Sequence, residues 1–312
     1  MTAERPLVER PPVAGGWDVD LPGRAVRLKA TRWRGVGTPI LLLHGLASTR
    51  HIWDLVVPGL SGRPVVALDQ RGHGDSDRPT GPYDGATVAA DALTALDALG
   101  ISRAVVVGHS WGASTALRLA AEAPGRVLAV VAVDGGLGSA RDAGASREEA
   151  RLRLTPPRTA LPPDELRRMV ARGPLAPWWS DSVADALLPL FGLAEDGMAR
   201  ARLPFEAHMA IVDDLLDTDP SSWLPRIGCP TWMVSCEPAD APDAWAVRKA
   251  AALAEAGRLL PLPRLHRWLG AVHDVPLQWP LLVAGLIAAA ADEAALGLAA
   301  GATPAAPAEV GA

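Results

Sequence analysis

The fold is decided by one stretch of the sequence, Ala104-Val105-Val106-Val107-Gly108-His109-Ser110-Trp111-Gly112-Ala113. An apolar run of this length is typical of a strand buried on both faces of a parallel sheet, and the residues after it have helical character. Glycines on both sides of Ser110 permit a sharp, strained turn between strand and helix, which exposes the serine hydroxyl. The stretch therefore predicts a nucleophilic serine at a strand-to-helix turn.

The position of Ser110 also predicts how its chemistry would be supported. The helix begins just after the serine, so backbone N–H groups and the positive end of the helix dipole lie beside it. Both stabilise the oxyanion that forms when a serine oxygen attacks a carbonyl carbon, and the N–H of Trp111 is one expected donor. The alternative is a glycine-framed turn around a buried serine that does no chemistry.

Strand-like and helix-like segments alternate along most of the chain. The expected strands are 25–33, 39–44, 64–69, 104–109, 128–134, 231–236 and 257–262. The expected helices lie near 50–60, 85–99, 111–123, 241–256 and 280–293. This alternation predicts an α/β fold with a mostly parallel central sheet of about eight strands flanked by helices.

The alternation stops between residues 140 and 225, where helical stretches with proline breaks follow one another. We interpret 140–225 as a helical cap, or lid, inserted after the sixth strand into a core formed by 16–139 and 226–296. The segments 1–15 and 297–312 are expected to be disordered, because the tail is rich in Ala, Gly and Pro and offers little apolar surface to bury.

Composition limits the partners and the compartment. The 312 residues carry a formal net charge of −5, which argues against a general nucleic-acid binder and favours a small-molecule substrate. Cys229 and Cys236 flank a predicted strand, so they would lie about 20 Å apart and do not pair. No signal peptide and no uninterrupted apolar run long enough for a bilayer is evident, so we expect a cytoplasmic protein without a membrane partner.

Two further segments accompany the serine motif: Ile40-Leu41-Leu42-Leu43-His44-Gly45-Leu46 and Pro64-Val65-Val66-Ala67-Leu68-Asp69-Gln70-Arg71-Gly72-His73-Gly74-Asp75-Ser76. With them the chain resembles the α/β-hydrolase family from its first sheet strands to its last helix. The resemblance implies that the N–H of Leu46 is the second oxyanion donor and that His44 shapes the loop. The serine at the elbow differs from the aspartate of epoxide hydrolases and haloalkane dehalogenases.

An activated serine needs a general base within hydrogen-bond reach, and histidine suits this role near neutral pH. His273 follows the predicted last strand and precedes the final helix, and the segment 270–280 resembles the catalytic-histidine loop of the family. His266 is the rival because it also lies past the predicted last strand. The other histidines have structural explanations in motif or helix-like segments: His44, His73, His109, His51 and His208.

The acid that would orient His273 is ambiguous. After strand 231–236 the family usually carries a glycine, an acidic residue and then the catalytic aspartate, and here Asp240 falls about one residue late. Asp134, at the end of the preceding strand, occupies an alternative acid position that some members use. We favour Asp240 over Asp134, with Asp243 and Glu237 behind them.

The cap would form the crevice for substrate, as in open α/β sheets generally. Its pocket candidates, which could equally pack the cap against the core, are Trp178, Trp179, Phe205, His208, Met209 and Trp223. No spacing resembles a metal site, a Rossmann glycine motif or a P-loop, so no metal or cofactor is expected.

These observations predict a serine hydrolase that cleaves an ester, lactone or thioester of a small, largely apolar compound through an acyl-enzyme intermediate. Ser110 would attack and His273 would transfer the proton. Two alternatives remain: the same fold performing acyl transfer, carbon–carbon bond cleavage or perhydrolysis, and a non-catalytic member that binds a ligand or partner. The oligomeric state is unknown at this stage.

Overall fold

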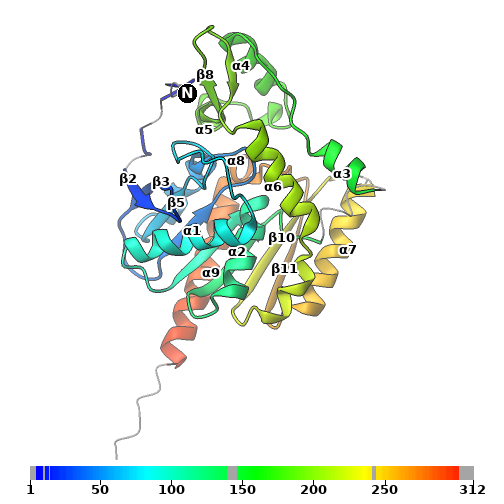
Figure 1. Cartoon of the computed structure of the whole chain (residues 1–312). Coiled ribbons are helices and arrows are strands. Elements are labelled where there is room, and N and C mark those ends of the chain that lie inside the picture. The colour runs from blue at the N-terminus through cyan, green and yellow to red at the C-terminus, as the bar shows by residue number, and fades with distance from the viewer. Residues whose placement is uncertain (1–4, 10, 14, 139–145, 241–243, 302–312) are drawn as a thin grey trace, which may run out of the picture.

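The computed structural model describes residues 5–9, 11–13, 15–138, 146–240 and 244–301. Its centre is an eight-stranded sheet with helices on both faces (Figure 1). The strand order is β11-β10-β7-β6-β4-β5-β3-β2. Neighbours from β11 to β5 run parallel, whereas β3 pairs antiparallel with both β5 and β2. The predicted α/β architecture is confirmed.

The strands of this sheet are β2 Gly16–Pro22, β3 Arg27–Trp33, β4 Ile40–Leu43, β5 Val65–Leu68, β6 Ala104–His109, β7 Val127–Val133, β10 Thr231–Glu237 and β11 Pro263–Leu269. The four central strands, β4 to β7, are buried along their whole length, which explains their continuous apolar sequences. In contrast, the edge strand β11 alternates between half-buried and exposed residues because only one of its faces is covered.

Two hydrophobic layers enclose the sheet. One face packs against α1 Gly85–Ala98, α2 Trp111–Glu122 and α7 Ala244–Leu259. The opposite face packs against α9 Pro280–Gly301 and two 3₁₀ turns, η1 Arg50–Trp53 and η2 Val57–Leu60. A short helix, α8 Val275–Gln278, precedes α9. These layers hold the carboxyl ends of the parallel strands at one edge, below the elements that separate β7 from β10.

The cap, defined here by the described residues 146–226, lies over that edge for most of its length (Figure 1). Its last residues, among them Trp223 and Leu224, instead pack in the core cluster that contains residues of α2 and α7. Its helices are α3 Arg147–Arg153, α4 Pro163–Ala171, α5 Asp181–Leu187 and α6 Phe205–Asp217. Its 3₁₀ turns are η4 Ala176–Trp178, η5 Leu188–Leu190, η6 Pro220–Ser222 and η7 Leu224–Arg226. A small antiparallel sheet joins β8 Phe191–Leu193 and β9 Ala199–Ala201 with β1 Arg5–Pro6. The cap thus contains strands as well as the expected helices.

Several sequence expectations about elements were wrong. The strand expected at 257–262 is instead the end of α7 and a turn, and the last strand is β11, because the alanine-rich helix continues to Leu259. Residues 50–60 form two 3₁₀ turns, the second containing Pro58, rather than one helix. The segment expected to be disordered at 1–15 contributes β1 to the cap, and α9 continues to Gly301 in the expected tail. Residues 302–312 lie outside the described part.

Helix α9 contains one stretch, Pro280–Gly297, with the length and composition of a membrane span and a mean hydropathy of 1.5. Two acidic side chains interrupt it, and both bind basic residues of the core. Asp292 pairs with Arg63 at 2.8 Å, and Glu293 pairs with Arg264 at 2.5 Å. Because α9 also packs against η2, β6 and β7, it serves as one of the helices that cover the sheet.

Candidate active site

Ser110 lies in the sharp turn between β6 and α2. Its backbone has φ 54° and ψ −119°, a region that costs free energy for residues other than glycine. The flanking glycines are required by close contacts: a Cβ on Gly108 would lie 2.0 Å from the carbonyl oxygen of Gly112, and one on Gly112 would lie 2.4 Å from that of Leu43. The chain therefore approaches itself too closely for any side chain at either position.

Ser110, His273 and Asp134 form a hydrogen-bonded chain. The Nε2 atom of His273 lies 3.0 Å from Ser110 Oγ, and its Nδ1 atom lies 2.7 Å from Asp134 Oδ2. An ionised carboxylate only accepts hydrogen bonds, so we place the ring hydrogen on Nδ1, which leaves Nε2 free to accept from the serine hydroxyl. This arrangement is the one that general-base activation of a serine needs.

The loop carrying His273 is fixed from two sides. Gln278 accepts a hydrogen bond from the Val272 N–H and donates one to the Gly270 carbonyl, each at 2.8 Å. His109, next to the nucleophile, donates from Nε2 to the carbonyl oxygen of His273 at 2.8 Å. His273 is thereby aligned although its side chain is 55% exposed.

The structure brings Asp134, rather than Asp240, to His273. Asp134 follows β7 with φ 45°, and its side chain is only 2% exposed, whereas Asp240 is exposed in the turn after β10. This geometry corrects the preference for Asp240. Glu237, the last residue of β10, pairs with Arg267, and the chain that follows carries Asp240 into solvent. Asp243 lies outside the described residues.

Asp134 is held by more than the histidine. Its Oδ1 atom accepts hydrogen bonds from the Cys236 backbone N–H at 2.8 Å and from Lys249 Nζ at 2.6 Å. Burial alone would raise the pKa of Asp134, but the hydrogen bond and charge of His273, together with Lys249, lower it to about 2. The carboxylate is therefore ionised throughout the neutral range.

The electrostatics of the two histidines beside Ser110 differ. Desolvation would lower the pKa of His273, but the hydrogen bond and negative charge of Asp134 outweigh it and raise that pKa above its ordinary value. His109 is buried, and this burial lowers its pKa to about 4. His109 is thus neutral near pH 7, and His273 is the histidine that titrates near the serine.

The predicted oxyanion donors flank the serine. Trp111 is the first residue of α2, so its N–H has no acceptor within the helix. Leu46 follows Gly45, where an added Cβ would lie 3.0 Å from Ser110 Cβ. His44 is fully buried beneath this loop, donating from Nδ1 to the Gly45 carbonyl at 2.8 Å and accepting at Nε2 from the Gln70 N–H at 3.0 Å. His44 therefore shapes the loop, in agreement with its expected role.

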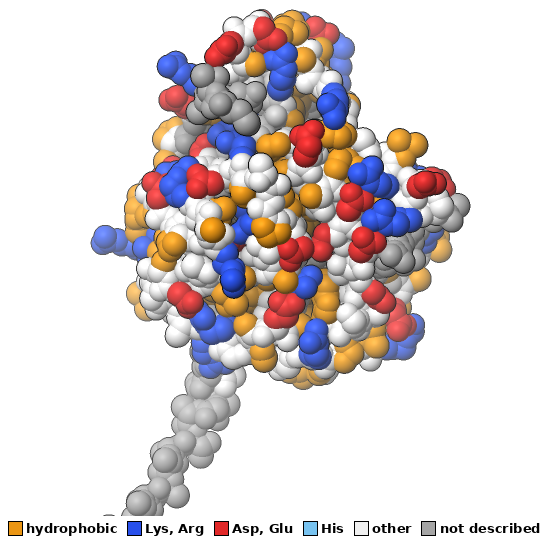
Figure 2. All heavy atoms as spheres, viewed as in Figure 1, with side chains coloured by type: hydrophobic (Ala, Val, Ile, Leu, Met, Phe, Trp, Pro, Cys, Tyr) orange, Lys and Arg blue, Asp and Glu red, His pale blue; other side chains and the backbone are white. Residues whose placement is uncertain are grey.

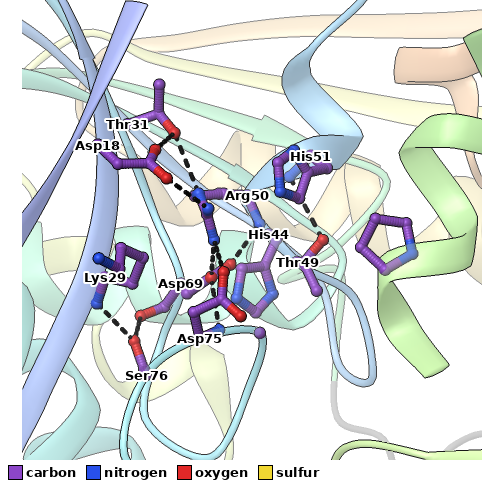
Figure 3. Close-up of polar contacts among 12 residues, drawn as sticks. Asp18, Lys29, Thr31, His44, Thr49, Arg50, His51, Asp69, Asp75 and Ser76 are labelled. Carbon is purple, nitrogen blue, oxygen red and sulfur yellow. Dashed lines mark hydrogen bonds and ion pairs between the residues drawn. The ribbon is translucent and has the colours of Figure 1, made fainter. Parts of the chain in front are cut away.

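A buried ion network supports the same loop (Figure 3). The side chain of Arg50 is buried, and its guanidinium donates hydrogen bonds to Asp69, Asp75, Asp18 and Thr31. The backbone N–H of Arg50 also donates to Asp69 Oδ1, at 2.7 Å. Burial would raise the pKa of Asp69, but Arg50 holds it well below its ordinary value. The network connects the turn after Leu46 to the loop after β5.

The remaining histidines lie apart from the nucleophile or serve its surroundings. His266 is in β11, stacked on Trp232 with ring centroids 5.5 Å apart, which removes the rival base. His51 binds Asp54 at 2.9 Å. His73 accepts from the Ala47 N–H at 3.2 Å and stacks on Trp111, and burial lowers its pKa to about 3.

A cavity of about 470 Å³ lies between the cap and the core loop that follows Leu46. Core residues 47–49 and His73 line one side of it, and the cap lines the other with segments 156–160 and 200–205. Ser110 and His273 are not among its described lining residues. On the core side its lining begins one residue beyond Leu46 and includes His73, which stacks on Trp111.

Of the six pocket candidates, only Phe205 and His208 line this cavity. Met209 is buried in the cap core, and Trp223 is buried under Arg118, whose guanidinium lies 5.3 Å from its ring. Trp179 packs partly against the main core, and Trp178 is 36% exposed. Most of the lining residues missed from sequence lie in three segments, 47–49, 156–160 and 200–204, and the two cap segments carry no recognisable motif.

Lys249 and Arg50 were also missed. Lys249 contacts Asp134 from a helix 115 positions away, so no local pattern could reveal it, although it is one of only two lysines in the chain. Arg50 lies a few residues after Leu46. Asp69 directly follows the apolar strand sequence 65–68, and a carboxylate at the end of a buried strand is a signal that a buried cation pairs with it. Within the described residues, no group of three or more His, Cys, Asp or Glu could hold a metal ion.

Comparison with known proteins agrees with this fold. The family model of the alpha/beta hydrolase fold matches residues 38–209. A 2-(acetamidomethylene)succinate hydrolase of Mesorhizobium japonicum is 38% identical over 104 residues, covering 33% of this chain and 37% of that protein. An esterase of Mycobacterium tuberculosis is 39% identical over 112 residues, covering 36% and 37%. The chain thus aligns with little more than a third of the length of these curated relatives.

Likeness in structure extends further than likeness in sequence. The crystal structure of E-2-(acetamidomethylene)succinate hydrolase superposes with a TM-score of 0.74 and 24% identity, covering 89% of this chain and 99% of that one. At this identity the likeness shows the fold alone. Together with the match of the family model to more than half of the sequence, it establishes that the chain belongs to the α/β-hydrolase fold family.

Proposed function

We propose that the protein is a serine hydrolase with the triad Ser110, His273 and Asp134. The observation that carries the proposal is the continuous chain of hydrogen bonds from Asp134 through His273 to Ser110, at 2.7 and 3.0 Å. Family membership supports hydrolase chemistry, and esterase and hydrolase activities are those named for the two sequence relatives.

The proposed reaction has two halves. Ser110 Oγ attacks the carbonyl carbon of the substrate while His273 Nε2 accepts its proton, and the oxyanion binds the N–H groups of Trp111 and Leu46. His273 then donates the proton to the departing alcohol or thiol, leaving an ester on Ser110. In the second half His273 removes a proton from water, whose oxygen attacks that ester, and His273 then returns the proton to Ser110 Oγ as the ester bond breaks and the acid is released. The exposure of His273 to solvent gives water access to this step.

The cavity beside Leu46 supports a small, largely apolar substrate. Its histidine on the core side, His73, is uncharged near neutral pH. The guanidinium groups of Arg202 and Arg200 in its wall pair with Asp75 and Asp196 at 2.7 and 2.6 Å. The third arginine of the wall, Arg158, stacks on Phe205 with its guanidinium 3.8 Å from the ring centre and lies 4.0 Å from Glu206. Because these charges are compensated, the cavity favours the uncharged part of an ester, lactone or thioester, and the cap acts as the lid that selects it.

A cytoplasmic protein with a small-molecule substrate and without nucleic-acid or membrane partners is part of the same proposal. The net charge of −5 supports it, and on the face drawn in Figure 2 basic and acidic side chains are interspersed rather than gathered by sign. The face drawn there offers no stripe of positive charge for phosphates or anionic lipids.

The test is mass spectrometry after treatment with a fluorophosphonate, which phosphonylates an activated serine. We expect a single adduct on Ser110 in the wild type and none in Ser110→Ala or His273→Ala. p-Nitrophenyl esters of increasing acyl length then report turnover. A wild-type protein that is folded by circular dichroism but acquires no adduct and cleaves no ester would refute the proposal and favour a binding function.

A further inference from the structure

The carboxylate of Asp134 is shared between two basic groups. His273 Nδ1 donates to Oδ2, whereas Lys249 Nζ from α7 donates to Oδ1 at 2.6 Å. Both members of the Lys249 pair are largely shielded from water, with 12% of the lysine side chain and 2% of the aspartate side chain exposed. An ion pair in such a position acts more strongly than one on the surface.

Lysine is rare in this protein. Lys29 and Lys249 are the only two lysines, and the other cations among the 30 basic residues are arginines. Arginine presents a wide planar fork, whereas the ammonium group is a compact charge on a flexible stem. At Asp134 the compact group shares Oδ1 with the N–H of Cys236, which leaves Oδ2 to the imidazole.

We propose that Lys249 is a positioning residue for the reaction, which holds Asp134 toward His273 and offsets the carboxylate charge so that the imidazole releases its proton readily. This inference rests on the proposed function. Lys249 and the Cys236 backbone N–H hold Oδ1 of Asp134, and Oδ2 accepts the hydrogen bond that orients His273.

Charged groups of both signs act on the imidazole of His273. Asp134 from the end of β7 and the adjacent Asp274 both favour the protonated imidazole, whereas Lys249 opposes it. His109, whose ring centroid lies 4.8 Å from that of His273, is neutral near pH 7 because burial lowers its pKa.

Two groups at the end of β10 complete the surroundings. Burial raises the pKa of the Cys236 thiol, which is therefore uncharged near pH 7. Glu237 is neutralised by Arg267, whose Nε lies 2.9 Å from Oε1. Without Lys249, two carboxylates would act on the imidazole, and the ammonium group beside Asp134 that opposes them would be lost.

The experiment measures the rate of fluorophosphonate inactivation against pH for the full chain, which reports the titration of His273 without knowledge of the substrate. In Lys249→Met the midpoint of the acid limb should rise by about one pH unit, because a positive charge beside the carboxylate is lost. Lys249→Gln, which keeps a hydrogen-bond donor without the charge, should show the same rise. Lys249→Arg should restore most of the wild-type midpoint.

The matched control is Lys29→Met. Lys29 pairs with Asp20 at 2.8 Å between β2 and β3, away from the triad, so its removal should leave the midpoint unchanged. A midpoint in Lys249→Gln that stays at the wild-type value, or a rate lowered equally at every pH, would assign the lysine a purely structural role and overturn the inference. Failure of the wild type itself to react would instead overturn the proposed function.

Discussion

Removing the guanidinium of Arg50 should destabilise the fold through one buried charge. Asp69 is 0% exposed, and in Arg50→Met it keeps only the backbone N–H donors of residues 50 and 75, at 2.7 and 2.9 Å. Breaking a buried ion pair by removing one partner costs about 3–5 kcal/mol. The side chains of Asp18 and Asp75 are about a third exposed, so water can replace their contacts with Arg50. The loss of these two contacts therefore adds little to the cost in unfolding free energy. We expect a loss of about 4 kcal/mol, a large share of the 5–15 kcal/mol typical of a folded protein.

The assay is urea unfolding followed by tryptophan fluorescence at pH 7.5 and pH 5. In the wild type, Arg50 depresses the pKa of Asp69, so the stability it contributes is present above the ordinary value of about 3.9 and is lost below it. In the variant, burial without a counter-charge raises that pKa, and protonation relieves the cost as the pH falls, so the difference from wild type should shrink at pH 5.

Arg63→Met is the control for this experiment, because Arg63 pairs with Asp292, whose side chain is 61% exposed. Loss of such a surface pair should cost less than about 1 kcal/mol. The reasoning would be refuted by a difference below about 1 kcal/mol for Arg50→Met, or by a larger one with no dependence on pH.

Three further outcomes are expected. Asp134→Asn should lower kcat/KM for a p-nitrophenyl ester by about 10⁴, because the tautomer of the His273 imidazole is no longer fixed. Asp240→Asn should keep a kcat/KM near the wild-type value, and the reverse pattern would assign Asp240 as the acid. Because the pKa of His273 is raised above about 6.5, kcat/KM should fall tenfold per pH unit below that raised value, and a profile flat to pH 5 would contradict this assignment. Gly112→Ala places a Cβ 2.4 Å from the Leu43 carbonyl, so we expect a lower melting temperature and loss of Ser110 labelling, and an unchanged variant would argue against the tight turn.

The parts of the site that were predictable from the sequence are those encoded locally. Ser110 and its two glycines form one short turn, and His273 sits in a loop with its own pattern, so both positions could be proposed without knowledge of the fold. The buried central strands were equally accessible, because continuous apolar runs at residues 104–107 and 128–133 indicate strands covered on both faces.

The acid was less accessible because its choice depends on where two chain segments run in space. Both Asp134 and Asp240 follow parallel strands, and only the path of the chain after β10 shows that Asp240 faces solvent. Lys249 reaches Asp134 across 115 positions, a contact that no spacing rule contains. The edge strands β2 and β11 were missed or misplaced for a related reason: their charged residues and alternation lack the apolar continuity of the central strands.

The short strand β1 gives the cap an attachment that an insertion between β7 and β10 does not otherwise have. Arg5–Pro6 pairs with β8, and the N–H of Leu7 donates to the Phe191 carbonyl at 2.9 Å. Figure 1 shows this N-terminal segment beside β8 at the far end of the cap. The N-terminal segment therefore adds to the two chain connections of the cap and to its contacts with the core, such as Arg202–Asp75, so any opening must either break the β1–β8 pairing or carry the N-terminal segment with the cap. A fusion partner placed before β1 would therefore be attached to the cap, whereas one placed after α9 would be attached to the core.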